Sequence, residues 1–65
     1  MKRKARLLVR GDLVVDTRAV VRGRLADDAI VWTTPDGLVL VDLRVGRHLQ
    51  QWGADADVEI EPRDG

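Results

Sequence analysis

Cysteine, serine, tyrosine, phenylalanine and asparagine are all missing from this chain of 65 residues. Without cysteine, a disulfide scaffold, a cysteine-type zinc finger and a thiol nucleophile are excluded. Without serine and asparagine, a serine hydrolase and an Asn-linked glycan are excluded. Without tyrosine and phenylalanine, the chain lacks the side chains that most often stack on single-stranded bases. These absences restrict the chain to functions that need none of these groups.

Long apolar runs are missing as well. No run approaches the roughly 20 residues of a membrane-spanning helix, and no signal peptide follows the basic N-terminal residues. Arginine far exceeds lysine, which is typical of GC-rich coding in an actinobacterium or its phages. We therefore expect a cytoplasmic protein, or a virion-associated one if it comes from a phage, with no membrane partner.

The length predicts one small domain with a marginal core, because a chain of this size buries only about 60% of its unfolded surface. Hydrophobic residues make up 45% of the chain, which is enough to drive folding. We expect a basic N-terminal arm over residues 1–6, a single domain over residues 7–62 and a tail over residues 63–65.

The formal net charge of zero hides an uneven distribution. Residues 1–24 contain eight basic and two acidic side chains, and residues 25–65 contain three basic and nine acidic ones, so the two parts carry +6 and −6. Such asymmetry can mark a nucleic-acid surface or an acidic tail. It can equally mark two parts that neutralise each other in the folded state, and we favour this second interpretation.

Turn signals and alternating residues predict a chain of short strands. The clearest hairpin joins strands at 29–33 and 38–44 through Thr-Pro-Asp-Gly at 34–37, because proline presets φ and glycine accepts a left-handed conformation. The second of these strands is apolar on both faces, which predicts that it is covered on both sides or lies at a barrel seam.

Other strands are predicted around a Gly-Asp hairpin turn at 11–12, which separates apolar segments at 7–9 and 13–15. A further strand is predicted over 19–25. The last strand, 57–61, alternates cleanly, so Val58 and Ile60 should point inward. Its three acids should face water and form a negatively charged sheet edge.

One helix is expected before this last strand. Val45, His48, Leu49 and Trp52 lie at i, i+3, i+4 and i+7, and Gly53 suits a helix C-terminus. The predicted fold is therefore all-β with one short helix: a small barrel of five to six strands, OB-like or SH3/Sm-like.

From residue 20 to residue 62 the pattern resembles the OB-fold of bacterial translation initiation factor one. The shared features are a strand with a mid-strand glycine (Gly23), a hairpin at Asp36 and Gly37, a short helix, and a strand reading Asp-Val-Glu-Ile-Glu-Pro. That family adds a strand after this point, whereas this chain places its additional strands at the N-terminus. We use the resemblance only as support for a barrel.

Charged residues are the candidate partner-binding sites. The basic set consists of Lys2, Arg3, Lys4, Arg6, Arg18, Arg22 and Arg24, and the acidic set consists of Asp57, Glu59 and Glu61. The basic side chains can track phosphates, which gives salt-sensitive binding, or pair with acids of the second part. Both interpretations stay open. For the arm, the possible anchors are acids of its own chain, acids of a neighbouring copy or partner protein, and phosphate, and we favour a neighbour or partner protein over phosphate.

Catalytic, cofactor and metal sites are not expected. His48 is the only histidine and has no partners in sequence, so we expect it to pack on the apolar side of the helix. The alternating acids begin like a calcium loop, but Ile60 stands where that loop needs glycine. Trp32 and Trp52 can stack bases or lie at a subunit contact, and we expect at least one of them to lie in the core.

These observations predict a non-enzymatic interaction or assembly module, such as a phage or actinobacterial accessory protein. It would self-associate or dock on a larger protein assembly through complementary basic and acidic faces. The alternative is a small nucleic-acid-binding barrel that uses the basic N-terminal half. We expect a homo-oligomer or a larger assembly, and no small-molecule substrate.

Overall fold

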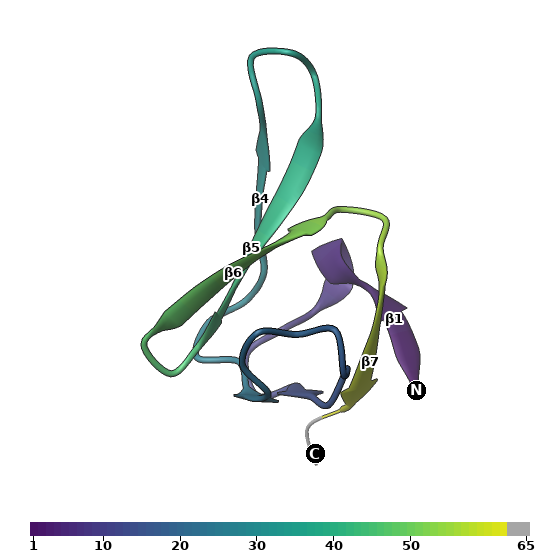
Figure 1. Cartoon of the computed structure of the whole chain (residues 1–65), viewed down its shortest axis with the longest axis vertical. Helices are drawn as coiled ribbons and strands as arrows, with labels where there is room; N and C mark the ends of the chain where they lie inside the picture. Colours follow the sequence, from purple (N-terminus) through teal and green to yellow (C-terminus); the bar gives the residue numbers. More distant parts are fainter. Residues whose placement is uncertain (63–65) are drawn as a thin grey trace.

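The computed structural model describes residues 1–62, in which the backbone forms two antiparallel sheets. The four-stranded sheet has the order β1-β7-β2-β3 and consists of β1 (Lys2–Lys4), β7 (Asp57–Glu61), β2 (Leu13–Val14) and β3 (Gly23–Arg24). The three-stranded sheet has the order β4-β5-β6 and consists of β4 (Ile30–Thr33), β5 (Val39–Val45) and β6 (His48–Gly53). Figure 1 shows this arrangement.

The all-β prediction is confirmed, but the two sheets are not closed into a barrel. An isolated bridge between Leu25 and Val45 connects the three-stranded sheet to the chain just after β3. The OB-like or SH3/Sm-like topology stays a prediction. The helical content of the described residues is the 3₁₀ helix η1 (Ala5–Leu7).

The hairpin of β4 and β5 is confirmed, and its turn forms as the turn residues predict. The Thr34 carbonyl accepts the N–H of Gly37 at 2.9 Å, and the Thr34 N–H donates to the Leu38 carbonyl at 2.8 Å. The Thr34 hydroxyl accepts the Leu38 N–H at 3.0 Å. Gly37 has a φ of 91°, a conformation that side chains with a Cβ rarely adopt.

The helix expected over residues 45–52 is wrong, because this segment is the β5–β6 hairpin. Val45 pairs with His48, so only Gly46 and Arg47 form the turn. Gly46 has a φ of 59°, and glycine at the first central position is what a type II′ hairpin turn requires. His48 is exposed at the start of β6 and does not pack in the core.

The core lies between the two sheets and is aliphatic. The inward face of β5 alternates strictly, and the first sheet contributes from β2 and β7. The buried members of these three strands are Val41, Leu43, Val45, Val14, Val58 and Ile60. Ala5, Leu8, Leu25 and Ala54 complete the cluster, and Trp52 packs against it while partly exposed. The expectation that one tryptophan enters the core holds only in this partial sense.

Gly23 of β3 lies close to the side chain of Val45 in β5. Its φ is 152°, and a Cβ at this position would lie 2.9 Å from Cγ1 of Val45. Atoms this close would have to shift, so glycine at this mid-strand position avoids a clash with Val45.

The predicted register of residues 57–61 is confirmed, but its edge position is wrong. Val58 and Ile60 are fully buried, Asp57 and Glu61 are exposed, and Glu59 is half-buried. However, β7 lies between β1 and β2 and is therefore an interior strand. The basic N-terminal segment, and not solvent, covers the edge that was expected to be open.

The N-terminal half contains less strand than its sequence predicts. Residues 7–9 form no strand, because Leu7 is the last residue of η1 and a turn follows Val9. In this turn the Asp12 N–H donates to the Val9 carbonyl at 3.1 Å, and Gly11 has a φ of 94°. The strand expected over 19–25 is reduced to β3. Residues 15–22 form a loop that side chains hold in place, as described below.

Candidate interaction surface

The basic arm is bound to the acidic strand of its own chain. β1 pairs with β7 in antiparallel register, which sets Lys2 opposite Glu59 and Lys4 opposite Asp57. The Met1 amine lies 2.9 Å from Oε2 of Glu59. The structure thus provides an anchor for the arm that needs neither a neighbouring copy nor phosphate.

Two arginines of the arm also pair with acids from elsewhere in the chain. Arg6 forms an ion pair with Asp55, and this contact lowers the pKa of Asp55. Arg3 is half-buried, with Nη1 3.8 Å from Oδ2 of the buried Asp12. Asp12 also accepts the N–H of Val9 at 3.0 Å. The Arg6–Asp55 contact joins the two oppositely charged parts of the chain, whereas the Arg3–Asp12 contact lies within the basic part.

Arg18 and Asp16 form the best-organised ion pair of the described residues. Asp16 is 5% exposed and accepts Nε and Nη2 of Arg18 at 2.9 and 2.8 Å. It also accepts the N–H of Glu59 at 2.9 Å. The Arg18 bonds, and then the Glu59 bond, hold the pKa of Asp16 well below its ordinary value, and the same pair raises the pKa of Arg18.

The guanidinium of Arg18 also lies 5.4 Å from the centre of the Trp52 ring, within cation–π range. It therefore ties the 15–22 loop to both sheets. Arg22 is exposed in this loop, whereas Arg24 of β3 donates to the Gly11 carbonyl at 2.8 Å. Because residues 15–22 form no strand, Arg18, Arg22 and Arg24 do not lie on one strand face.

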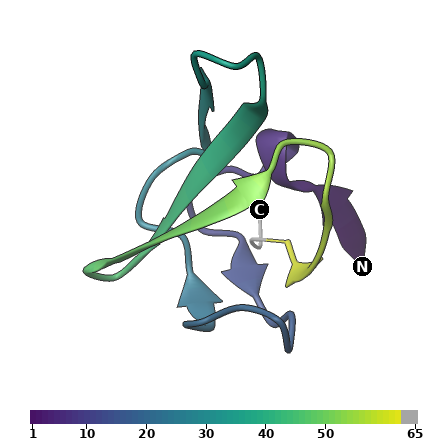
Figure 2. The ribbon, with the colours of Figure 1, turned by 45° about the horizontal axis from the view of Figure 1, so that its top comes forward.

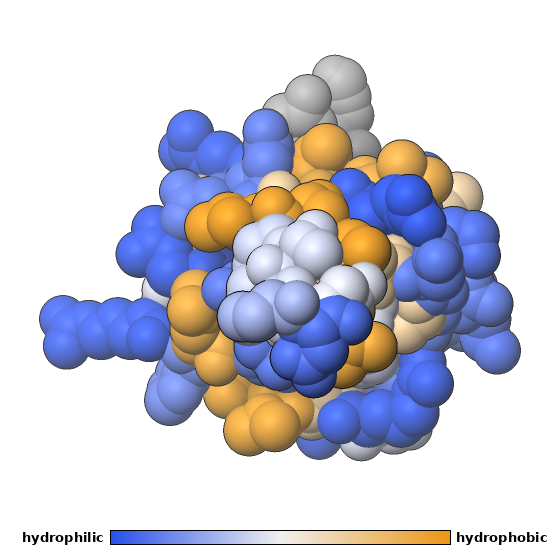
Figure 3. Space-filling view, turned by 90° about the horizontal axis from the view of Figure 1, so that it is seen from above, coloured by the Kyte–Doolittle hydropathy of each residue, from blue (hydrophilic) through white to orange (hydrophobic). Residues whose placement is uncertain are grey.

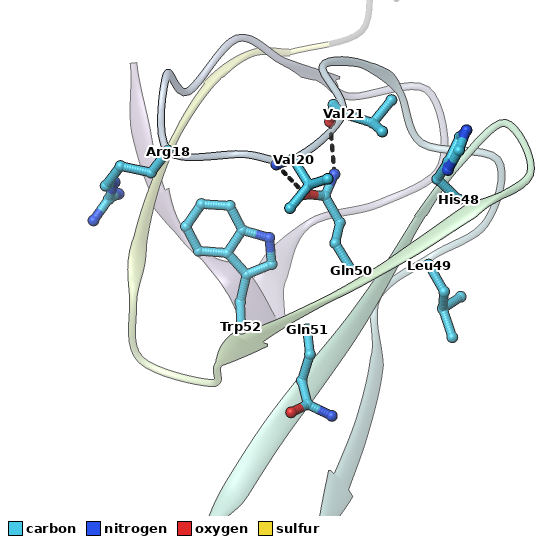
Figure 4. Close-up of a pocket in the computed structure, with 8 residues that line it drawn as sticks. All are labelled: Arg18, Val20, Val21, His48, Leu49, Gln50, Gln51 and Trp52. Atoms are coloured by element: carbon cyan, nitrogen blue, oxygen red, sulfur yellow. Dashed lines mark hydrogen bonds between the residues drawn. The ribbon is translucent and has the colours of Figure 1, made fainter.

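A pocket of about 380 Å³ lies beside Trp52, and its lining is shown in Figure 4. Gln50 is buried at its base, where Oε1 accepts the Val20 N–H at 3.0 Å and Nε2 donates to the Val21 carbonyl at 2.6 Å. Because Gln50 and Arg18 are both engaged within the chain, the pocket's best polar groups support the loop. His48 and Gln51 are the other polar side chains of its lining.

The outer part of the β4–β5 hairpin is exposed on both faces. The exposed fractions of its large apolar side chains are 52% for Ile30, 49% for Val31, 37% for Trp32, 58% for Leu38 and 45% for Val39. We call residues 30–39 the apolar hairpin. It projects beyond the rest of the molecule in Figure 1 and Figure 2, and it accounts for a long axis of 36 Å against 23 and 22 Å.

Figure 3 views the molecule from above, onto the tip of this hairpin, and shows apolar surface around the more polar turn. The two faces are distinct because paired residues share a face: Trp32 lies opposite Leu40, and Val31 lies opposite Val41. Only the second of these rows continues into the core. The first row belongs to the opposite face of the sheet, where Trp32 is 37% exposed and Leu40 is half-buried.

This surface was misread from the sequence. The apolar character of residues 38–41 on both faces predicted a covered strand, but a strand that projects past the core shows the same pattern and leaves Leu38 and Val39 exposed. The signal for this exposure in the sequence was the turn at 34–37, because the turn limits how far the core can extend along the hairpin. Trp32 is 37% exposed and stays a candidate contact residue.

Comparison of the chain with protein-family models, with curated proteins and with solved structures finds no match. Within residues 1–62, histidine and acidic side chains form no group that could hold a metal ion. The same residues contain no helix long and apolar enough to cross a membrane.

Proposed function

We propose that this protein is a small, non-enzymatic interaction module that docks on a copy of itself or on a larger protein assembly through the apolar hairpin. The observation that carries this proposal is the exposure of five large apolar side chains on one projecting element. Contiguous exposed apolar surface on a small protein commonly marks an interaction site. Trp32 adds an aromatic side chain of the kind enriched in interface contacts.

The charged strands β1 and β7 have a different role in this proposal, which is to stabilise the fold. The Met1 amine, Arg6 and Arg18 each form an ion pair with an acid of the same chain. Charges that are already paired contribute less to a new interface than free ones, because the existing partners must be given up. We therefore assign the basic and acidic parts to folding and the apolar hairpin to docking.

Site-specific photo-crosslinking in cells that produce the protein tests this proposal. A photoreactive residue at Leu38 is compared with one at Arg47, since both are exposed next to a hairpin turn of the same sheet. We expect a discrete adduct from Leu38 and none from Arg47. Adding Ile30→Glu, which places a charge within the apolar hairpin, should abolish the adduct.

Two results would contradict the proposal. One is equal crosslinking from both positions, which would indicate random encounters. The other is crosslinking at Leu38 that is insensitive to Ile30→Glu, since a real docking surface must respond to a charge placed within it.

A further inference from the structure

The outer edge of β4 has a short row of free backbone groups. β4 is the last strand in the order β4-β5-β6. Thr34 and Leu38 form a hydrogen-bonded pair, and such pairs alternate along an antiparallel ladder. The backbone groups of Trp32 therefore face β5, whereas those of Val31 and Thr33 face outward, where no other strand of residues 1–62 pairs with them.

This row is limited on both sides. Toward the start of β4, the N–H of Ala29 already donates to the Leu8 carbonyl at 3.0 Å. Toward the turn, the next outward residue is Pro35, which has no N–H. Within residues 1–62, this leaves the edge with two donors that have no partner, the N–H groups of Val31 and Thr33, placed symmetrically about Trp32.

We propose that the occupant of this edge is β4 of a second copy of the chain, antiparallel to the first about a two-fold axis at Trp32. The inference depends on the proposed function and specifies the partner and the register. Val31 of each copy then lies opposite Thr33 of the other copy, so all four free N–H groups donate across the interface. The two Trp32 side chains face each other as a non-hydrogen-bonded pair.

The absence of charge supports a second copy over an unrelated strand. Residues 29–34 contain no charged side chain, so the edge lacks the lysines and acids that usually prevent edge-to-edge pairing. A partner strand must offer backbone groups that match those of Val31 and Thr33 without extending to Ala29 or Pro35. β4 of a second copy meets this condition by symmetry. A two-fold interface is also the commonest form of self-association.

The surroundings of the edge are compatible with this register. Leu7 and Val9 are 56% and 38% exposed, and they flank Leu8, which is bonded to the base of β4. Antiparallel pairing places the turn of the second copy beside this base. The apolar turn residue Leu38, 58% exposed, thereby approaches a second patch of exposed apolar side chains.

Proline substitution on the two edges of the same sheet tests the pairing. Val31→Pro removes an outward N–H on β4, and Leu49→Pro removes one on the far edge of β6, where Leu49 is 60% exposed. Each dimer with Val31→Pro loses two hydrogen bonds, so its dissociation constant should rise roughly 10- to 100-fold in sedimentation equilibrium. Leu49→Pro should leave the dissociation constant unchanged.

Disulfide crosslinking tests the register without depending on that variant. The chain has no cysteine, so Trp32→Cys and Ile30→Cys each introduce a single thiol. Cα atoms of a non-hydrogen-bonded pair lie about 4.5 Å apart, which suits a disulfide. In this register the thiols that Ile30→Cys introduces in the two copies would be separated by about 13 Å along the strands. Under mild oxidation, Trp32→Cys should form a covalent dimer and Ile30→Cys should not.

The outcomes separate this inference from the proposed function. A dimer that survives Val31→Pro, or equal crosslinking by the two cysteine variants, overturns the register but leaves the apolar hairpin as a docking surface. A monomeric chain whose Leu38 position still crosslinks to another protein overturns the second copy as occupant. Loss of all crosslinking at Leu38 overturns the proposed function itself.

Discussion

Ile60→Ala and Ile30→Ala make the same chemical change at the two isoleucines of the chain, in opposite environments. Ile60 is fully buried in β7, whereas Ile30 is 52% exposed on β4. Truncating a buried isoleucine costs about 2–5 kcal/mol, because packing is lost and a cavity remains. Truncating a half-exposed one costs about 1 kcal/mol or less, because little apolar area returns to water.

The loss at Ile60 comes from packing and not from the backbone. Its N–H donates to the Met1 carbonyl at 2.7 Å, and its register partner is Val14. Alanine keeps both the backbone hydrogen bond and the strand pairing. A chain of this length is stable by about 3–10 kcal/mol, so Ile60→Ala removes a large part of the free energy of unfolding, and a chain near the lower limit would unfold.

Urea denaturation followed by tryptophan fluorescence and far-ultraviolet circular dichroism measures both variants. Trp52 reports on the core because it packs against it. Protein concentrations are kept low, so that association does not add to stability. We expect a much lower midpoint for Ile60→Ala and a nearly unchanged one for Ile30→Ala. Equal midpoints, or a greater loss at Ile30, would refute the assignment of β7 to the core.

Two further predictions concern the joint between the sheets and the loop. Gly23→Ala should destabilise the fold by about 1–3 kcal/mol, because its Cβ would meet Val45 at 2.9 Å, whereas Gly53→Ala, with open space around it, should cost about 1 kcal/mol or less in the same urea titration. Asp16 has a pKa below its ordinary value of 3.8 because of Arg18, so its stabilisation is complete above that value and is lost as pH falls toward the folded-state pKa. Asp16→Asn should therefore lower stability at neutral pH and flatten its decline in acid. An equal loss from both glycine variants, or an unchanged acid profile, would contradict these assignments.

Local chemistry made two elements predictable from sequence. The hairpin turn at 34–37 follows from Pro35 and Gly37, whose conformational preferences operate within four residues. The inward register of Val58 and Ile60 follows from strand alternation, because only one register buries both. Neither inference required knowledge of a distant part of the chain.

The expected helix failed because two structures share one pattern. Val45, His48, Leu49 and Trp52 have helical spacing, yet the type II′ turn at Gly46 folds the same residues into two paired strands. Only Val45 among these four is buried, and Leu49 and His48 are exposed. The helical spacing of these four residues was therefore a coincidence. Gly46, which favours a hairpin turn, was the stronger local signal.

Long-range contacts explain the remaining differences. Residues 19–22 alternate like a strand, but Gln50 and Asp16 bind the backbone of the loop that contains them and hold it in place. The interior position of β7 depends on β1, which lies at the other end of the described chain. The exposure of the apolar hairpin depends on how far the core extends, which residue patterns alone do not state.

The central claim is that the apolar hairpin, and not the charged strands, is the contact surface. A nuclear magnetic resonance dilution series, from millimolar to low micromolar protein, tests it residue by residue. We predict that backbone amide signals of residues 29–39 shift on dilution, led by Val31 and Thr33, while those of residues 2–6 and 57–61 stay constant. Shifts confined to residues 2–6 and 57–61, with an unchanged hairpin, would contradict it.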